Sequence, residues 1–245
     1  MLTRFGLLGI FWLNMVAGVE SPAGEKVIRI LPLGDSITQG GRRGRAEYTY
    51  RWPLFKLLVD AGVKFDFIGS CDTGLHRDFK WPDAYKGIPF DRDHEGVYGI
   101  RTAKAWARLP EAATKWPAPP DIVLIHLGTN DQKARDLEKE FKEPMRKIIR
   151  FLREQNPHVV ILLGQLMFND SPGAFRIMAC ISELRKELDT KASPVRVVLH
   201  YQGWHERPTD PDADTFDWAH PNPRGQEKMA RRWFEAMKPW LHNRE

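Results

Sequence analysis

Five apolar segments, rich in β-branched residues, alternate along the chain with segments of helical periodicity. They span residues 27–33, 64–69, 121–127, 159–163 and 195–199. Strands that are apolar at every position are buried on both faces, which is typical of parallel sheets covered by helices. The sequence therefore predicts an α/β fold, a three-layer α/β/α sandwich around a five-stranded parallel sheet.

Helices are expected over residues 52–61, 141–155 and 172–191, followed by a last helix that opens near residue 222. Ser171-Pro172 and Asn222-Pro223 each combine a capping side chain with a proline at the first helical position. Pro144 should start or kink the helix in which it lies. Strand and helix therefore alternate through most of the chain, as a doubly covered sheet requires.

Two further segments carry structural information. The last helix has one stripe of large apolar residues, which we interpret as core packing: Met229, Trp233, Met237 and Trp240. The stretch from residue 70 to residue 115 shows little regular pattern in its first half. A loop of this length in a compact domain is typically functional or mobile.

The first residues have the pattern of a secretory signal peptide. A short positively charged start precedes an apolar run over residues 5–19, and small or turn-forming residues follow. We expect cleavage after Gly18 or Ala23, so that residues 1–23 are a signal peptide and residues 24–245 form a single domain in a secreted or periplasmic protein. The run is short for a membrane span. No stable membrane insertion is expected after cleavage, and an uncleaved anchor is the alternative.

Charge and cysteine content limit the partners and the chemistry. The formal charge of +5 is too diffuse to indicate nucleic-acid binding. We interpret Arg42, Arg43 and Arg45 as a solvated basic loop, with attraction for acidic glycans as the second interpretation. Cys71 and Cys180 are the only cysteines. The sequence does not decide whether they pair, and neither has the spacing of a metal site.

A serine lies at the carboxyl end of the first predicted strand, where ligands of such sheets bind. Gly34-Asp35-Ser36 follows that strand directly. Glycine permits a sharp turn, after which a short helix would point its free backbone N–H groups toward the site. A hydroxyl in this position is a candidate nucleophile, although an N-capping Asp or Ser explains the motif equally well when it is taken alone.

Two further loops offer hydrogen-bond donors at the same edge. Asn130, in the segment 128–131, would point a side-chain N–H at an oxygen bound by Ser36 if the first and third strands are neighbours. Gly99, in the segment 94–99, would bring a backbone N–H close to that oxygen because it has no side chain. The alternatives are an Asx turn and an ordinary turn glycine.

Asp217 and His220 follow the fifth predicted strand, just before the last helix. Their three-residue spacing within a turn places a carboxylate beside an imidazole. Asp217 would fix the tautomer of His220, which would accept the proton of Ser36, a weak nucleophile without such a base. His126 lies inside a strand and is interpreted as core. Five others are interpreted as surface or satisfied structural groups: His76, His158, His200, His205 and His242.

Taken together, the four loop motifs resemble those of the SGNH hydrolase superfamily, named for its Ser, Gly, Asn and His. The resemblance covers about residues 28–240. It implies a flavodoxin-like fold, no metal or organic cofactor, and Ser36, Asp217 and His220 as catalytic residues. It also implies an oxyanion hole formed by the backbone N–H groups of Ser36 and Gly99 and by the side chain of Asn130.

Carbohydrate esterases of this superfamily, particularly acetyl xylan esterase-like proteins, resemble the chain more narrowly. The similar segments are 33–38, 66–70, 93–96, 127–131 and 220–222. Trp218 and the segment 48–51 depart from the usual pattern. The resemblance implies an acylated poly- or oligosaccharide as substrate, and flat rings in loops can stack on sugars. The candidate substrate-binding residues are Asp35, His94, Trp81, Tyr85 and Trp218.

These observations predict a secreted serine esterase that removes short acyl groups, acetyl first, from carbohydrate. A lipase, lysophospholipase or thioesterase on the same scaffold is the alternative, because one triad serves all of these reactions. The polar loops argue against the wide apolar mouth that a lipid groove needs. A non-catalytic carbohydrate-binding protein is the third interpretation, and an intact triad speaks against it. The oligomeric state is not indicated.

Overall fold

The computed structural model describes residues 27–167 and 171–241. The predicted signal peptide over residues 1–23, both of its expected cleavage points and His242 lie outside the described residues. Within the two described ranges, no helix combines the length and the apolar character needed to cross a bilayer.

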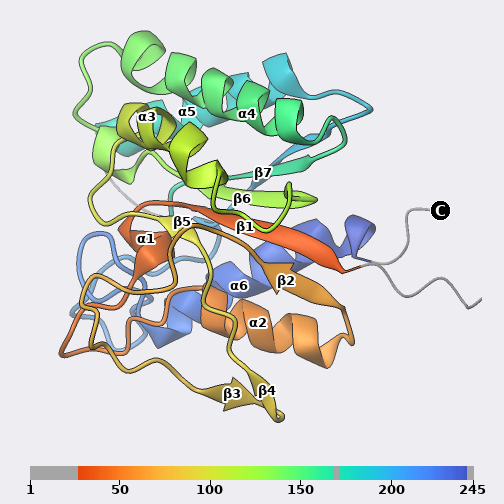
Figure 1. Ribbon diagram of the computed structural model, residues 1–245. Helices are drawn as coiled ribbons and strands as arrows, with labels where there is room; N and C mark the ends of the chain where they lie inside the picture. Colours follow the sequence, from red (N-terminus) through yellow and green to blue (C-terminus); the bar gives the residue numbers. More distant parts are fainter. Residues whose placement is uncertain (1–26, 168–170, 242–245) are drawn as a thin grey trace, which may run out of the picture.

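Parallel strands form the sheet at the centre of the molecule (Figure 1), in the order β2-β1-β6-β7-β8. Their bounds are β1 Ile28–Gly34, β2 Phe65–Phe67, β6 Ile122–His126, β7 Val160–Gly164 and β8 Val195–Val198. Counted along the chain, this is the order 2-1-3-4-5 of flavodoxin-like sheets. The five predicted strands are confirmed, and the first and third of them are neighbours.

A sixth, very short strand extends the sheet beyond the prediction. β5 (Glu95–Gly96) pairs in parallel with the last two residues of β1, so that Gly96 lies opposite Gly34. Two residues carry no periodicity that a sequence pattern could reveal. The pairing is nevertheless important for the site, because it places the chain after residue 96 alongside the carboxyl end of β1.

Helices cover both faces of the sheet, with α2 and α6 on one face and α3, α4 and α5 on the other (Figure 1). Their bounds are α1 Ser36–Gln39, α2 Arg51–Asp60, α3 Thr102–Ala113, α4 Glu143–Gln155, α5 Pro172–Leu188 and α6 Pro223–Met237. The predicted α/β/α sandwich is therefore confirmed. The shorter elements are the hairpin β3 Ala84–Tyr85 and β4 Ile88–Pro89, the 3-10 turns Thr129–Asp131 and Lys238–Trp240, and a π-helical turn Glu138–Lys142.

The helix starts agree with the sequence signals except at one cap. The Asn222 side chain accepts a hydrogen bond from the backbone N–H of Gly225 and so caps α6. Pro144 occupies the second position of α4, which therefore starts where a proline is tolerated. Ser171 stands at the N-cap of α5, but its hydroxyl bonds to Gln132 at 2.9 Å and makes no capping bond. The prediction of a Ser171 side-chain cap is wrong.

α3 is the main element that periodicity did not predict. Its buried residues are Thr102, Ala105, Leu109 and Ala112, of which only Leu109 is large and apolar, and Trp106 is partly buried against Phe151. Pro110 lies inside the helix, a position at which proline normally argues against helix. Because its buried positions are mostly small residues and a proline lies inside it, this helix has no clear apolar stripe in the sequence.

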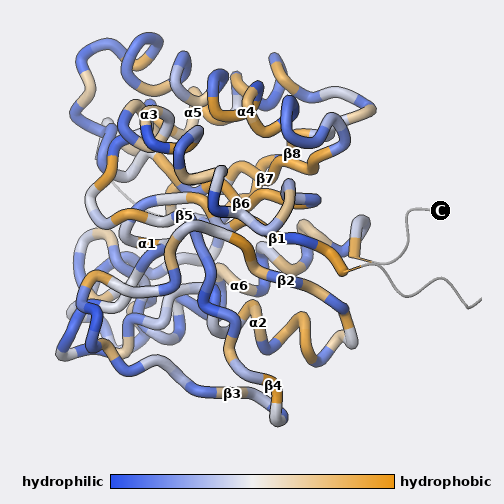
Figure 2. Tube along the Cα trace, in the orientation of Figure 1, coloured by the Kyte–Doolittle hydropathy of each residue, from blue (hydrophilic) through white to orange (hydrophobic). Residues whose placement is uncertain are grey.

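The core lies on both faces of the central strands. β6 and β7 have no exposed residue, and Figure 2 shows the hydrophobic colour concentrated on the strands and on the inner sides of the helices. The predicted stripe on α6 is confirmed for Met229, Trp233 and Met237, which are fully buried. Trp240 is partly buried against the same core. Cys71 and Cys180 are free thiols and form no disulfide with each other.

Two buried histidines lie between β6, β8 and α6. His126 is fully buried, as predicted. His200 is also buried, and its ring packs at 4.5 Å against Trp233. Among the described residues, no ring nitrogen of either histidine has a hydrogen-bond partner. His200 is therefore neither a surface group nor a satisfied one, which corrects the prediction. Burial lowers the pKa of His126 to about 4 and that of His200 well below its usual value.

Acid should destabilise the protein through these histidines. In the unfolded chain these histidines bind a proton near pH 6.5, whereas in the native state they stay neutral down to a lower pH. Their neutral form therefore contributes full stability above pH 6.5, and this contribution is lost as pH falls toward 4. Between pH 7 and 5, His126 alone should cost about 2 kcal/mol of unfolding free energy. Urea unfolding of His126→Leu should show a correspondingly smaller loss. His205→Leu, at an exposed histidine, is the matched control, and equal losses in all three proteins would contradict the assignment.

Candidate active site

Ser36 is held in a tight turn between β1 and α1. A Cβ atom at Gly34 would lie 2.3 Å from Thr38 Oγ1 and 2.6 Å from the carbonyl oxygen of His126, so only glycine fits there. Asp35 caps α1 by accepting a hydrogen bond from the N–H of Ile37 at 2.9 Å. Ser36 is the first residue of α1, and its hydroxyl lies at the carboxyl end of β1 together with its backbone N–H, which donates to no acceptor among the described residues.

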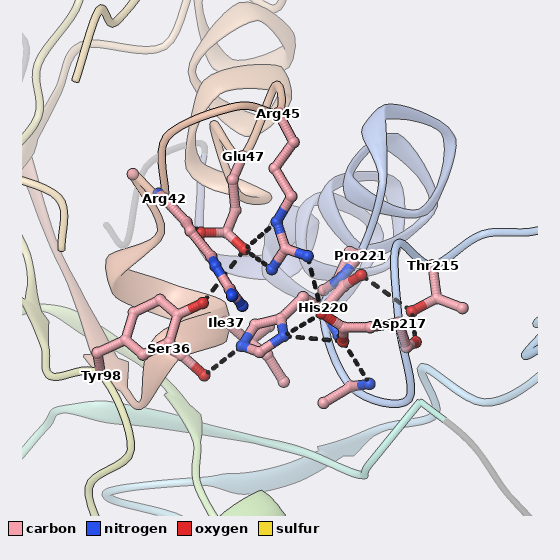
Figure 3. Close-up of polar contacts among 12 residues, drawn as sticks. Ser36, Ile37, Arg42, Arg45, Glu47, Tyr98, Thr215, Asp217, His220 and Pro221 are labelled. Carbon is pink, nitrogen blue, oxygen red and sulfur yellow. Dashed lines mark hydrogen bonds and ion pairs between the residues drawn. The ribbon is translucent and has the colours of Figure 1, made fainter. Parts of the chain in front are cut away.

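The structure brings Ser36, His220 and Asp217 into one hydrogen-bonded series (Figure 3). His220 Nε2 lies 3.0 Å from Ser36 Oγ. On the other side of the ring, His220 Nδ1 lies 2.9 Å and 3.0 Å from the two carboxylate oxygens of Asp217. The hydroxyl comes from the turn after β1, and the imidazole and the carboxylate come from the turn before α6. This is the geometry in which an imidazole can accept a hydroxyl proton while a carboxylate fixes its tautomer.

The turn that carries His220 is fixed by its own hydrogen bonds. The hydroxyl of Thr215 donates to the carbonyl oxygens of Asp217 and His220. The N–H of Phe216 donates to the His220 carbonyl at 2.8 Å. The Asn222 side chain, besides capping α6, donates to the carbonyl of Ala213 at 2.7 Å. The imidazole is therefore held by a closed turn that is continuous with a long helix.

Asp217 is held ionised by its donors. Its Oδ1 accepts the backbone N–H groups of Ala219 and His220, each at 2.9 Å, and its Oδ2 accepts Arg45 Nη1 at 2.7 Å. Partial burial acts to raise the pKa of Asp217, but Arg45 and the two backbone donors outweigh it and hold the pKa well below the usual range. The carboxylate is consequently negative at neutral pH.

Two of the predicted oxyanion donors lie in loops at the same edge. Asn130 lies in the 3-10 turn after β6 and donates one N–H to the carbonyl of Ile100 at 3.0 Å, which leaves its second N–H for a ligand. Gly99 follows β5 with φ of +73°, and a Cβ there would meet open space. Within the described residues, the N–H of Gly99 and one N–H of Asn130 have no hydrogen-bond acceptor.

Two predicted substrate-binding residues are fully buried. Burial raises the pKa of Asp35 to about 7, and one of its oxygens is used to cap α1. His94 accepts the N–H of Gly96 at Nδ1 and donates from Nε2 to the carbonyl of Thr73. With no exposed surface, neither side chain can contact a substrate. The prediction that Asp35 and His94 bind substrate is wrong, and both instead shape the loops around Ser36.

The three aromatic residues predicted to contact substrate differ in their surroundings and their exposure. Trp81 packs against Phe79 at 4.9 Å and under the Arg51 guanidinium, so its ring serves packing. Tyr85 lies in the β3–β4 hairpin, far from α1 in Figure 1, and its hydroxyl donates to Asp60. Both side chains are partly buried against neighbouring residues, and their contact with substrate stays a prediction. Trp218 is 62% exposed beside Asp217 and keeps its candidacy.

Three residues around the triad were not predicted in this role. Arg45 binds both Asp217 and Glu47, and it is only 16% exposed, so it is no part of a solvated loop. Its neighbour Arg43 pairs with Asp78 on the open surface, as a solvated group should. The ring of Tyr98 stacks on the His220 imidazole at 5.3 Å. Arg45 and Asp217 are 172 positions apart, so no local pattern could have joined them.

The sequence profile of the GDSL-like lipase/acylhydrolase family matches residues 33–228, a range that includes Ser36, Asp217 and His220. The chain belongs to this family. It is similar to a protein named multidomain esterase from Ruminococcus flavefaciens, with 27% identity over 91% of this chain and 30% of that protein. It is also similar to an acetylxylan esterase from Xylanibacter ruminicola, with 29% identity over 57% of this chain and 25% of that protein.

Solved structures of the family share the fold. An acetyl esterase crystallised as a mutant with an acetate ion superposes with a TM-score of 0.69 at 21% identity, over 88% of this chain and 98% of that one. The chain thus spans nearly all of this solved structure but less than a third of the length of the two curated relatives. The shared part is the α/β/α sandwich that carries the site.

Proposed function

We propose that the protein hydrolyses acetyl and other short acyl esters of carbohydrates through an acyl-enzyme on Ser36. The observation that carries this proposal is the series Ser36–His220–Asp217, with 3.0 Å between hydroxyl and imidazole. Ser36 Oγ attacks the ester carbonyl while its proton passes to His220 Nε2. The negative tetrahedral oxygen accepts the N–H groups of Ser36 and Gly99 and the free N–H of Asn130.

The second half of the reaction restores the site. His220 returns the proton to the sugar oxygen as the carbonyl–oxygen bond breaks, and the sugar hydroxyl leaves. Water then attacks the acyl-enzyme as His220 accepts its proton, and His220 returns that proton to Ser36 Oγ as the carbonyl–Oγ bond breaks and the carboxylic acid leaves. Asp217, kept ionised by Arg45 and two backbone donors, stabilises the imidazolium in both halves. These residues move every proton that the reaction requires.

Two observations support carbohydrate as the substrate: the names of the relatives and the side chains exposed at the edge of the site. Both curated relatives carry the name of an esterase, and one is named for acetylated xylan. In the described part of the chain, the rim beside Asp217 offers the exposed ring of Trp218, which suits a sugar face. Together with the sequence pattern of residues 1–23, this supports a secreted or periplasmic enzyme acting on acylated poly- or oligosaccharide.

A substrate panel tests this proposal against the lipase alternative. Acetate release should be measured from acetylated xylan, mannan, pectin and amino-sugar polymers, beside nitrophenyl esters of acetate and of a long-chain acid, with Ser36→Ala as the blank. We expect acetate from at least one polymer and a kcat/KM for the acetyl ester at least about tenfold above that for the long-chain ester. Preference for the long chain, without release from any polymer, would favour a lipase.

A further inference from the structure

A second layer of charged residues lies behind Asp217. The guanidinium of Arg45 donates from Nη1 to Asp217 at 2.7 Å, and from Nε and Nη2 to the same oxygen of Glu47. It also lies 4.8 Å from the centre of the Phe216 ring. These contacts fix the planar group in one orientation, and the side chain is only 16% exposed. Figure 3 shows the guanidinium between the two carboxylates.

Glu47 is built to hold Arg45. Its side chain is only 3% exposed, so the ion pair that it forms is shielded from water. Its second oxygen accepts the backbone N–H of Arg42 at 2.9 Å, and its carbonyl accepts the N–H of Gly41. The hydroxyl of Tyr98 lies 3.5 Å from the first oxygen, and the ring of the same tyrosine stacks on His220. The layer therefore contacts the imidazole both through Asp217 and through Tyr98.

We propose that Arg45 and Glu47 are positioning residues that extend the hydrogen-bonded series of the site to Glu47–Arg45–Asp217–His220–Ser36. Arg45 aligns the Asp217 carboxylate with His220 Nδ1, and Glu47 holds Arg45 in place and balances its charge. This inference rests on the proposed function, since it assigns these residues to a proton transfer between Ser36 and His220. Neither residue contacts the reacting atoms.

The charges of this layer have opposite effects on the imidazolium. Around His220 stand the carboxylate of Asp217, the Arg45 guanidinium, the Glu47 carboxylate, the Tyr98 phenol and, beside that phenol, Arg42. Loss of the Arg45 charge leaves the two carboxylates unopposed and favours the imidazolium. Loss of the Glu47 charge does the reverse. If Arg45 and Glu47 only stabilised the fold, their neutral variants would not shift the protonation of His220 in opposite directions.

Two neutral variants and one control test the proposal by the pH dependence of kcat/KM on a short acetyl ester. In Arg45→Gln, the acid limb of the profile should move to higher pH by about 0.5–1 unit, and in Glu47→Gln it should move to lower pH by about as much. The kcat of Arg45→Gln should fall by up to about 10²-fold with KM nearly unchanged, because the carboxylate is misaligned. Arg43→Gln breaks only the exposed pair with Asp78, and it should change neither the position of the acid limb nor kcat.

Arg45→Lys separates charge from geometry. Lysine keeps the positive charge but cannot hold two carboxylates with a planar fork. Its acid limb should therefore stay near that of the wild type while its kcat falls. Thermal unfolding of each variant reports whether the fold survives. Shifts in the same direction for Arg45→Gln and Glu47→Gln, or no shift in folded and active variants, would overturn the proposal.

A measurement independent of turnover separates this inference from the proposed function. The imidazole protons and nitrogens of His220 can be titrated by NMR in the wild type and in the same variants. If no ester is hydrolysed but the titration midpoint moves up in Arg45→Gln and down in Glu47→Gln, the proposed function fails and the coupling stands. If turnover depends on Ser36 and the midpoint does not move, the coupling fails alone.

Discussion

Replacing Ser36 with alanine should lower kcat/KM for a short acetyl ester by about 10⁶-fold while the protein remains folded. Ser36 Oγ is the group to which His220 Nε2 is aligned, and without it the carbonyl has no protein nucleophile to attack it. The residual rate would come from water attack with the oxyanion donors still in place. Initial rates with nitrophenyl acetate, together with the thermal midpoint, measure both parts of the prediction.

Ser70→Ala provides a matched control for that substitution. The Ser70 hydroxyl donates to the buried Glu95, which also binds Arg108 and the indole N–H of Trp116, so its loss leaves the carboxylate with other partners. This variant should keep its kcat/KM within about twofold. A second readout is covalent: an organophosphonate should label the wild type on the peptide that contains Ser36 and should leave Ser36→Ala unlabelled. Retained turnover in folded Ser36→Ala would remove the proposed nucleophile.

The sheet and the position of the site followed from the sequence because both depend on local pattern and on one geometric rule. Strands such as Ile122–His126 are buried at every position and apolar at all but the last, a pattern typical of a sheet covered on both faces. The rule that ligands bind beyond the carboxyl ends of parallel strands then selected the loops that carry Ser36, Asn130 and His220. The role of Gly34 could be predicted for the same reason, because the chain must turn sharply between the strand and the helix that carries Ser36.

The sequence failed where the outcome depends on tertiary partners. The β3–β4 hairpin turns at Lys86-Gly87, and a lysine with φ of +49° is no common turn signal. Asp35 and His94 stand in the motifs that suggested the site, yet they stabilise the loops from inside, and only burial distinguishes that role from substrate contact. Arg45 was placed with two neighbouring arginines on a basic loop. Its partner Asp217 comes from the other end of the chain, so the pair could not be inferred.

Replacing Asp217 with asparagine should lower kcat by about 10³- to 10⁴-fold with little change in KM. The carboxylate accepts donors at both oxygens, and an amide offers only one acceptor oxygen. With the amide oxygen at the Oδ1 position, its NH₂ group faces Arg45, donor against donor. With the amide reversed, the NH₂ group faces the N–H groups of Ala219 and His220. Either arrangement removes the negative charge that stabilises the imidazolium.

Asp212→Asn is the matched control, because Asp212 pairs with His205 at 2.7 Å in the same loop region, but with both side chains about half exposed. Its kcat should stay within about twofold of the wild type, since exposed pairs contribute little. The double variant Asp217→Asn/Arg45→Gln should lose no more than Asp217→Asn alone, because removing Arg45 relieves the donor–donor contact and because residues that act as a unit are not additive. Losses that multiply would instead mean that Arg45 acts on the reaction independently of Asp217.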